Sequence, residues 1–220
     1  APCIGLGAIH MQKKYKDSIM VVLPSDHLVK YDSMFLTTLK DAVKIALLDS
    51  HLVTIGITPD YPETGYGYIK FNPKHCVGRG FLVDCFVEKP SIKNAKEYIA
   101  SDEYLWNSGI FVWKVSSILA KFKELTPSLY EGLENIKNKL YSEDEEFTLE
   151  KEYKQFPSIS IDYAILEKSN NIYTVPGTFG WDDVGSWLAV ERIKTTNEFG
   201  NIVDGNVITI DSNDCIIEAG

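Results

Sequence analysis

The sequence has few of the residues that cross-link small proteins. It holds four cysteines and four histidines in 220 residues, with neither the paired cysteine spacing of a zinc finger nor an HExxH pattern. Cys3, Cys76, Cys85 and Cys215 are scattered, so we expect reduced and mostly buried thiols. A chain of this length buries about 70 to 75% of its unfolded surface and builds a core without such cross-links.

Long apolar runs and a secretion signal are also absent. No run approaches the roughly 18 apolar residues that a membrane span requires. No basic start is followed by an apolar stretch and a small-residue cleavage site. We therefore expect a cytoplasmic protein that does not bind a membrane.

Positive charge is in short supply. There are 22 Lys and Arg residues against 31 Asp and Glu, which gives a net charge of −9. Duplex binding depends on clustered Lys and Arg that neutralise phosphates, so we expect no nucleic-acid partner. The charge does not exclude binding of a small anionic ligand, because one or two well-placed cations are enough to hold it.

The hydrophobic pattern predicts an α/β fold. Residues 18–23 (SIMVVL) form a short apolar run typical of a strand buried on both faces of a parallel sheet. Apolar residues at steps of three and four over 35–47 predict an amphipathic helix. Residues 52–57 (LVTIGI) predict a second buried strand. Strand, helix and strand within about 40 residues make a βαβ unit.

Further elements follow along the chain. We expect strands at residues 81–88, 109–113 and 172–175, an acidic solvated loop or helix end at 142–150, and helices that begin at Ser91, Thr126, Ser160 and Ser186. Beyond Gly200 the texture changes to short β runs at 207–210 and 215–217. The predicted domains are therefore 1–198 and a β segment, 199–220, which is too short to fold alone.

The start of the chain is abrupt. Ile4, Ala8 and Met11 lie at steps of four and three and indicate a helix. A doubly wound sheet that begins at this point lacks an early strand and exposes an apolar edge. We expect that a preceding segment is missing.

Two acidic motifs lie far apart in the sequence. PSDH (residues 24–27) follows a predicted strand, where open α/β sheets bind ligands. Its Asp26 either holds Mg²⁺ or caps the next helix. WDDVGSW (residues 181–187) joins two carboxylates, a costly arrangement unless they are hydrated or neutralised. Either a cation binds there, or Asp183 or Ser186 caps a helix.

Three further motifs offer contacts to a ligand, and each has a structural alternative. GYGY (residues 65–68) brings backbone close to a ligand at Gly67, or forms a tight hairpin with exposed tyrosines. Glu88 and Lys89 offer an acceptor for hydroxyls and an ammonium for phosphate if the strand ends there, and otherwise form an ordinary solvated edge. Asn107, before Ser-Gly, binds a hydroxyl or makes a turn.

In order and spacing, these motifs resemble the sugar-1-phosphate nucleotidylyltransferases, and most closely the bacterial mannose-1-phosphate guanylyltransferase family. The segments that carry the resemblance cover essentially the whole chain: APCIGLGA, VVLPSDH, IGITPDYPETGYGYIK, FVEKP, WNSGIF, SIDYAILEK and WDDVGSW. The resemblance implies a Rossmann-like three-layer α/β/α nucleotide-diphospho-sugar transferase fold. Its sheet is mixed, and the start of a β-rich C-terminal extension follows.

The resemblance also implies a reaction and a site. The reaction joins mannose 1-phosphate to GTP by in-line attack on the α-phosphate, giving GDP-mannose and pyrophosphate with Mg²⁺ as cofactor. By the resemblance, Asp26 and Asp183 hold Mg²⁺, and Lys89 contacts the sugar phosphate. The residues around the sugar are Gly67, Glu88, Asn107 and Asp162. For Asp162, helix capping or an orienting role is as compatible with the motif.

One departure from the family pattern bears on activity. The family opens with a glycine-rich GGxGxRLxPxS loop and a PK pair that cradle the nucleotide, and no such segment occurs here. The resemblance does not extend to the fused isomerase domain of some members. We expect a fragment that carries the sugar-phosphate half. A uridylyl- or thymidylyltransferase, a non-catalytic sugar-nucleotide sensor subunit and a homo-oligomer all stay open.

Overall fold

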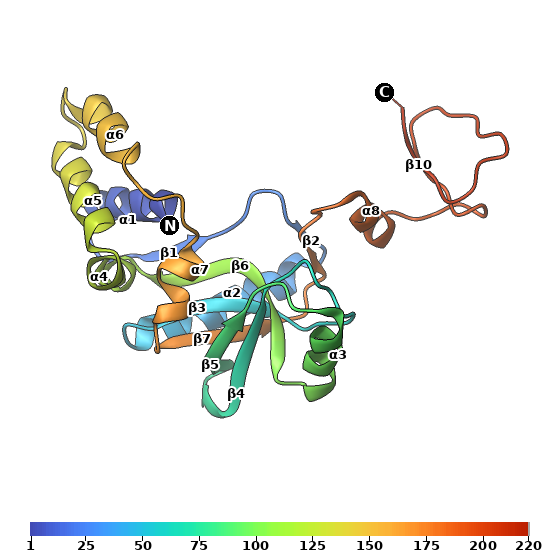
Figure 1. Cartoon of the computed structure of the whole chain (residues 1–220), viewed down its shortest axis with the longest axis horizontal. Helices are drawn as coiled ribbons and strands as arrows, with labels where there is room; N and C mark the ends of the chain where they lie inside the picture. The colour runs from blue at the N-terminus through green and yellow to red at the C-terminus, as the bar shows by residue number, and fades with distance from the viewer. Residues whose placement is uncertain (220) are drawn as a thin grey trace. The chain divides into compact units, whose positions relative to one another are not determined.

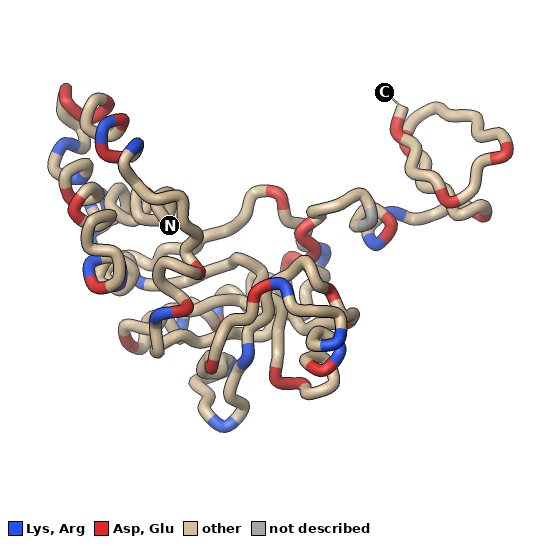
Figure 2. The backbone as a smooth tube through the Cα atoms, in the orientation of Figure 1, with Lys and Arg blue, Asp and Glu red and all other residues tan. Residues whose placement is uncertain are grey.

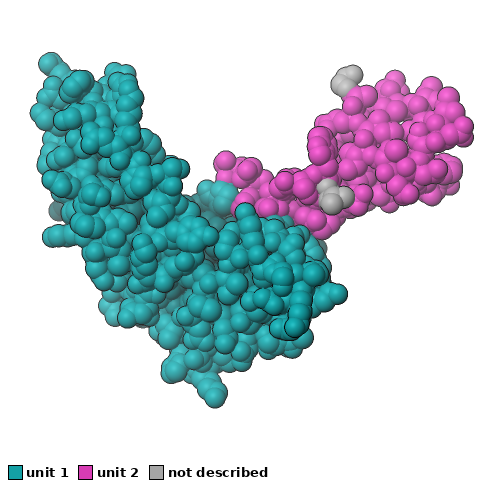
Figure 3. Space-filling model, viewed as in Figure 1, with its two compact units in different colours: residues 1–24, 31–179 teal, residues 25–30, 180–220 magenta. Residues whose placement is uncertain are grey.

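The computed structural model describes residues 1–219, which form two compact units. Unit 1 comprises Ala1–Pro24 and Tyr31–Phe179, and unit 2 comprises Ser25–Lys30 and Gly180–Gly220 (Figure 3). Ser25–Lys30 thus belongs to unit 2, although the residues before and after it in the sequence belong to unit 1. The predicted domain boundary near residue 198 stays a prediction.

Unit 1 is built on a six-stranded sheet (Figure 1). The strands, in spatial order, are β1 (Ile19–Val22), β6 (Tyr104–Lys114), β3 (Leu52–Ile57), β7 (Ile172–Gly177), β5 (Gly80–Val87) and β4 (Tyr68–Val77). The β3–β7 pair is parallel, and the other neighbouring pairs are antiparallel. The predicted α/β class with a mixed sheet is confirmed.

Helices pack on both faces of this sheet. The helices of unit 1 are α1 (Pro2–Tyr15), α2 (Asp32–Leu48), α3 (Ile92–Ser101), α4 (Val115–Leu125), α5 (Pro127–Lys139), α6 (Glu145–Tyr153), α7 (Ile161–Ala164) and the short 3₁₀ turn η1 (Leu166–Lys168). Buried residues of α1, α4 and α5 form one cluster with Leu52 of β3. Val53 points to the opposite face of β3, where α2 packs.

The predicted βαβ unit is confirmed, with one correction. All six residues of β3 are buried, as a central strand requires. The strand predicted at 18–23 exists as β1, but it lies at the sheet edge, antiparallel to β6, and Val21 is exposed. The prediction of a central parallel strand was wrong because β6, from much later in the chain, inserts between β1 and β3.

The predicted helix starts are confirmed, although only two have the predicted caps. Ser91 Oγ accepts from Asn94 N at 3.3 Å, and Ser160 Oγ accepts from Tyr163 N at 3.3 Å. Thr126 precedes α5, but its hydroxyl donates to the Phe122 carbonyl at 3.0 Å. The last predicted helix is α8 (Trp187–Ile193) of unit 2, which begins after Ser186 without a side-chain cap.

Other predictions need correction. Residues 145–150, predicted as a loop or helix end, begin α6, because Glu145 and Glu146 in the first turn favour the helix dipole. Residues 207–210 form no strand, and the parallel pair in this region joins β9 (Ile202–Asp204) to β10 (Ile216–Glu218). The four cysteines are exposed rather than buried, since each lies in a first turn, a loop or an outward strand position.

The surface carries both signs of charge. Basic segments are scattered among acidic ones along the chain (Figure 2), and most of the ion pairs join neighbours on one helix or turn. Among the described residues, no helix is both long and apolar enough to span a membrane.

Candidate functional site

Unit 2 brings the two distant acidic motifs onto one strand pair. β2 (Leu28–Val29) runs antiparallel to β8 (Trp181–Asp182), with Leu28 opposite Asp182 and Val29 opposite Trp181. Continuing this register by one residue puts His27 opposite Asp183, and Asp26 is the next residue along. Asp26 and Asp183 therefore leave the same end of the pair, and the Asp26 side chain is 83% exposed.

A ring contact fixes the strand pair beside these carboxylates. Trp181 Nε1 donates to His27 Nδ1 at 3.1 Å, and the two rings meet edge to face with centroids 5.2 Å apart. Since Nδ1 accepts this hydrogen bond, Nε2 carries the proton of the neutral ring. His27 Nε2 lies 4.0 Å from an Asp26 oxygen. The contact between Trp181 and His27 thus joins the two strands at the end that Asp26 precedes.

The two adjacent aspartates of WDDVGSW have different surroundings. Asp182 is buried and accepts from Arg192 Nε at 2.8 Å and from Arg192 Nη2 at 3.2 Å. The Val184 N–H also donates to Asp182, at 2.8 Å. Asp183 lies beyond the end of β8 and accepts from the Gly185 N–H at 3.1 Å. The protein itself neutralises one carboxylate of the adjacent pair.

The donors at this strand end suit Mg²⁺ better than a softer metal. Within residues 1–219, no group of three or more His, Cys, Asp or Glu side chains could hold a metal ion. Mg²⁺ takes one or two protein carboxylates and completes its octahedron with water and phosphate oxygens. Asp26 and Asp183 match that requirement, and their assignment as ligands stays a prediction.

In unit 1, the amide of Asn107 is the centre of a polar cluster. Asn107 Nδ2 donates to Asp162 Oδ1 at 2.9 Å, and Asn107 Oδ1 accepts from Gly109 N at 3.2 Å. Its backbone N–H donates to the Gly67 carbonyl at 2.8 Å. The structure therefore brings three of the predicted site residues together from segments far apart in sequence.

A β-bulge aims this amide. The register of β3 against β6 shifts between Ile55 and Gly56, so Gly56 faces Asn107 whereas Ile55 faces Ile110. Gly109 has φ +70°, and Ser108 Oγ donates to the Ile55 carbonyl at 2.5 Å. The alternative of a turn at Asn107 was wrong, because the residue lies inside β6. Bulges re-aim side chains beside sites in this way.

Glycine at position 67 leaves room for the carboxylate of Glu88. A Cβ atom at Gly67 would lie 2.8 Å from Glu88 Oε2 and 3.6 Å from the Cβ of Asn107. The GYGY segment is not the tight hairpin of the alternative interpretation, since β3 and β4 are not neighbours in the sheet and Tyr68 is fully buried. Gly67, Glu88 and Asn107 form one small surface.

Glu88 and Lys89 lie just beyond the end of a strand, as their proposed roles require. β5 ends at Val87, so the strict alternation of a strand no longer separates their side chains. Lys89 has φ +42°, which turns the chain before the buried Pro90. Lys89 Nζ lies 3.9 Å from Glu88 Oε1, and the Lys89 side chain is 66% exposed. The ammonium is accessible to an anionic ligand.

Sequence reasoning missed one carboxylate near this cluster. Although Glu167 is exposed at the surface, partial burial of its carboxyl raises its pKa, and repulsion from Asp162 and Glu88 raises that pKa further. Glu167 belongs to the SIDYAILEK motif, in the turn η1 that follows α7. Its place in the same motif as Asp162 was the available signal.

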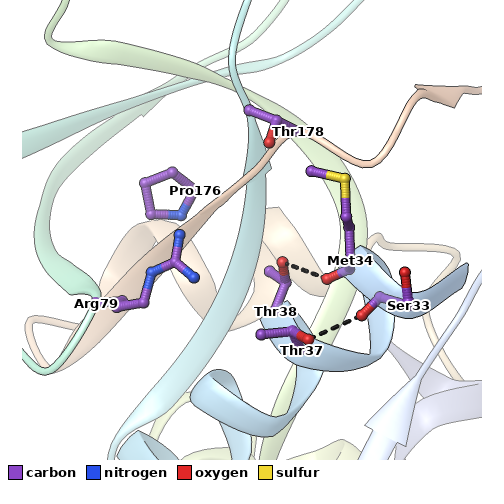
Figure 4. Close-up of a pocket in the computed structure, with 7 residues that line it drawn as sticks. All are labelled: Ser33, Met34, Thr37, Thr38, Arg79, Pro176 and Thr178. Carbon is purple, nitrogen blue, oxygen red and sulfur yellow. Dashed lines mark hydrogen bonds between the residues drawn. The ribbon is translucent and has the colours of Figure 1, made fainter. Parts of the chain in front are cut away.

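Unit 1 also has a pocket of about 230 Å³ that is lined by other residues than the polar cluster around Asn107 (Figure 4). Its lining is Ser33, Met34, Thr37, Thr38, Arg79, Pro176 and Thr178. The Thr37 and Thr38 hydroxyls donate to backbone carbonyls of α2 at 2.8 and 3.0 Å, and Arg79 pairs with Asp41 at 3.5 Å. The lining includes none of the residues predicted for the site.

Comparison with known proteins places the chain in a family. The model of the nucleotidyl transferase family matches residues 1–198. The chain belongs to this nucleotidyl transferase family. Mannose-1-phosphate guanylyltransferase of Salmonella montevideo is 34% identical over 225 residues, which cover 100% of this chain and 47% of that protein. Xanthan biosynthesis protein XanB of Xanthomonas campestris pv. campestris is 38% identical over 214 residues, 96% of this chain and 44% of XanB.

A solved structure agrees with this membership. It is described as a mannose-1-phosphate geranyltransferase from Thermus thermophilus, has a TM-score of 0.82 and 35% identity, and matches 93% of this chain and 57% of that chain. The Rossmann-like fold expected of a nucleotidyl transferase is thereby confirmed. The chain spans about half the length of the curated relatives it matches.

Proposed function

We propose that this nucleotidyl transferase acts as a mannose-1-phosphate guanylyltransferase and makes GDP-mannose and pyrophosphate from GTP and mannose 1-phosphate. Family membership and the name of the Salmonella relative support the reaction class. The observation that carries the proposal is the polar cluster of unit 1, in which Asn107 bonds to Asp162 at 2.9 Å beside Gly67 and Glu88.

The polar cluster suits a hexose. A sugar hydroxyl both donates and accepts hydrogen bonds, so it needs an acceptor and an amide at close range. Glu88 supplies the acceptor, while Asp162 fixes the orientation of the Asn107 amide. Glycine at position 67 keeps a Cβ out of the space beside Glu88 and Asn107, the two side chains assigned to the sugar. We assign the sugar to these four residues.

Lys89 is assigned to the sugar phosphate. An ammonium and a phosphate form a charge-assisted hydrogen bond, which is about twice as strong as a neutral one. In the reaction, a phosphate oxygen of mannose 1-phosphate attacks the α-phosphorus of GTP, and the bond to the β-phosphate breaks. Pyrophosphate leaves with the electron pair. The nucleophile is already an anion, so Lys89 needs only to hold it in line.

Asp26 and Asp183 are assigned to Mg²⁺. When bound, Mg²⁺ screens the repulsion between the two phosphate groups and stabilises the charge that develops on the leaving group. The strand pair β2–β8 supports this assignment, because Asp26 precedes β2 and Asp183 follows β8 at the same end of the pair. We therefore propose Mg²⁺ as the cofactor and GTP as the nucleotide.

A nucleotide panel tests the proposal. Pyrophosphate release is measured with the protein in its complete natural form, for GTP, UTP and dTTP, each with mannose 1-phosphate and with glucose 1-phosphate. The expected result is turnover with GTP and mannose 1-phosphate. A preference for UTP or dTTP with glucose 1-phosphate would identify the related enzymes instead. Binding of GDP-mannose in calorimetry without any pyrophosphate release would identify a sensor subunit.

A further inference from the structure

The turn after Asp183 adopts a conformation that its sequence disfavours. Val184 has φ +51°, in the left-handed region where a β-branched residue is a strong outlier. Such a residue persists only where its surroundings hold it, and strained residues gather at ligand sites. The side chains that hold Val184 are therefore of interest for the site.

Asp182 holds this turn. Its Oδ1 accepts the Val184 N–H at 2.8 Å, and the next N–H, of Gly185, donates to Asp183 Oδ1 at 3.1 Å. Two successive aspartates thus take two successive backbone donors. Asp182 reaches back under the turn from the buried side of β8, where its side chain is only 11% exposed.

Arg192 in turn holds Asp182. Its guanidinium donates from Nε to Oδ2 at 2.8 Å and from Nη2 to Oδ1 at 3.2 Å, the two-point geometry that only arginine offers a carboxylate. Both oxygens of Asp182 are thereby bonded within the protein. The pairing neutralises Asp182, the first of the two adjacent aspartates.

The helix that carries Arg192 is also tied to the strand next to Asp26. Lys30 Nζ donates to the Arg192 carbonyl at 3.4 Å, and Lys30 follows β2 directly. Gly180, with φ +66°, packs against the Lys30 side chain at the start of β8. Within unit 2, Arg192 therefore connects the turn beyond Asp183 to the strand that Asp26 precedes.

We propose that Asp182 and Arg192 are a positioning pair for the divalent-cation site: they set the Asp183 carboxylate beside Asp26, and Asp182 is not itself a ligand. This inference rests on the proposed function, which assigns the cation to Asp26 and Asp183. It adds that Asp182 binds the backbone N–H of Val184 and not the cation.

Direct cation binding tests the pair. Mn²⁺ is titrated into the full chain by calorimetry, with the electron paramagnetic resonance of free Mn²⁺ as a second readout. Arg192→Gln and Asp182→Asn are expected to weaken Mn²⁺ binding by about 10- to 100-fold, the usual effect of losing a partner behind a metal ligand. Arg192→Lys keeps the charge but only one donor point, and it is expected to recover part of the affinity.

A matched control separates position from charge. Lys194→Gln removes one positive charge two residues away, in an exposed ion pair with Asp204 at 2.6 Å, and it is expected to leave Mn²⁺ affinity unchanged. Melting curves check the fold of each variant. If Arg192→Gln does not fold, Asp182→Asn and Arg192→Lys decide the matter, since both nearly preserve shape.

Several outcomes would overturn the inference. One such outcome is that Arg192→Gln and Asp182→Asn both bind Mn²⁺ with wild-type affinity while Asp183→Asn loses binding. That result would refute the positioning role of Asp182 and Arg192 and leave the proposed function intact. Loss in Asp182→Asn with unchanged binding in Arg192→Gln makes Asp182 a ligand and refutes the positioning role. A wild-type chain that binds no Mn²⁺ removes the cation pair of the proposed function as well.

Discussion

At the scale of single residues, Asn107 has three of its polar groups fixed by partners. Its backbone N–H, its amide nitrogen and its amide oxygen bond to Gly67, Asp162 and Gly109 at 2.8, 2.9 and 3.2 Å. An amide with these fixed partners has little rotational freedom, so its orientation is set before a ligand arrives. This is the property that a hydroxyl-reading residue needs.

Lys89 tests the phosphate assignment. Lys89→Ala is expected to raise the KM for mannose 1-phosphate by roughly one to two orders of magnitude, because a hydrogen bond to a charged group contributes about 1.5 to 3 kcal/mol. Both residues carry a Cβ, so the strain at φ +42° is the same in each. Steady-state kinetics measure the effect.

Lys93→Ala is the control for this substitution. Lys93 is 84% exposed, pairs only loosely with Glu97 at 3.9 Å and lies on α3. The KM of this variant is expected to match that of the wild type. Equal KM and kcat in both variants would remove Lys89 from the site.

Glu167 makes a prediction about pH and stability. Its raised pKa means that the folded state disfavours the charged carboxylate, so stability is fully present below the ordinary value of 4.5 and is lost as the pH rises through the folded pKa. Glu167→Gln removes this loss. The variant is expected to melt at a higher temperature than the wild type at pH 7, and the difference is expected to shrink below pH 4.5.

Melting curves from about pH 4 to 8 measure this difference. Glu150→Gln, an exposed member of the Lys154 pair at 2.6 Å, is the control and is expected to show no such gain at pH 7. A Glu167→Gln variant that melts below the wild type at pH 7 would contradict the argument from burial and repulsion.

At the scale of elements, the bulge in β6 connects the core to the site. Ser108 is 1% exposed, donates to the Ile55 carbonyl and accepts from the Ile110 N–H at 3.2 Å. These bonds replace the ladder bonds that the extra residues of the bulge interrupt. A polar residue with this burial has a structural role in its strand and a positional role for its neighbour Asn107.

Ser108→Ala is expected to lower the free energy of unfolding by about 1 to 3 kcal/mol, because it leaves buried backbone groups without a partner. It is also expected to raise the KM for the sugar phosphate, since the bulge then no longer aims Asn107. Chemical denaturation and kinetics measure the two effects. Ser101→Ala, which removes an exposed bond to the Tyr98 carbonyl at 2.8 Å, is the control. Wild-type stability in Ser108→Ala would show that the hydroxyl does not hold the bulge.

At the scale of the whole molecule, the net charge bears on the proposed chemistry. A net charge of −9 opposes the approach of two polyanionic substrates. In the proposed function, Lys89 and Mg²⁺ supply the positive charge that offsets this repulsion.

Removal of the metal tests this requirement. Chelation with EDTA is expected to abolish pyrophosphate release, and added Mg²⁺ is expected to restore it. Asp183→Asn is expected to need a higher Mg²⁺ concentration and to lower kcat, because one ligand loses its charge. Turnover against Mg²⁺ concentration measures both. Normal turnover of Asp183→Asn at ordinary Mg²⁺ would refute the metal assignment.

Local order was well predicted from the sequence where it depends on near neighbours. The caps at Ser91 and Ser160, the helix after Ala1 and the wholly buried β3 follow from periodicity and from short-range hydrogen bonds. The edge position of β1 does not, because it depends on β6 inserting from later in the chain.

The candidate site, too, was predicted from the sequence only in part. The motifs alone indicated which residue types were available: a glycine, an amide and carboxylates at motif ends, and one lysine after a strand. The fold had to bring Asn107 to Asp162 across 55 positions, put Glu167 where Asp162 and Glu88 raise its pKa, and pair Arg192 with Asp182. Local propensity acts over a few residues, whereas these contacts depend on strand order and register, which the whole hydrophobic core selects.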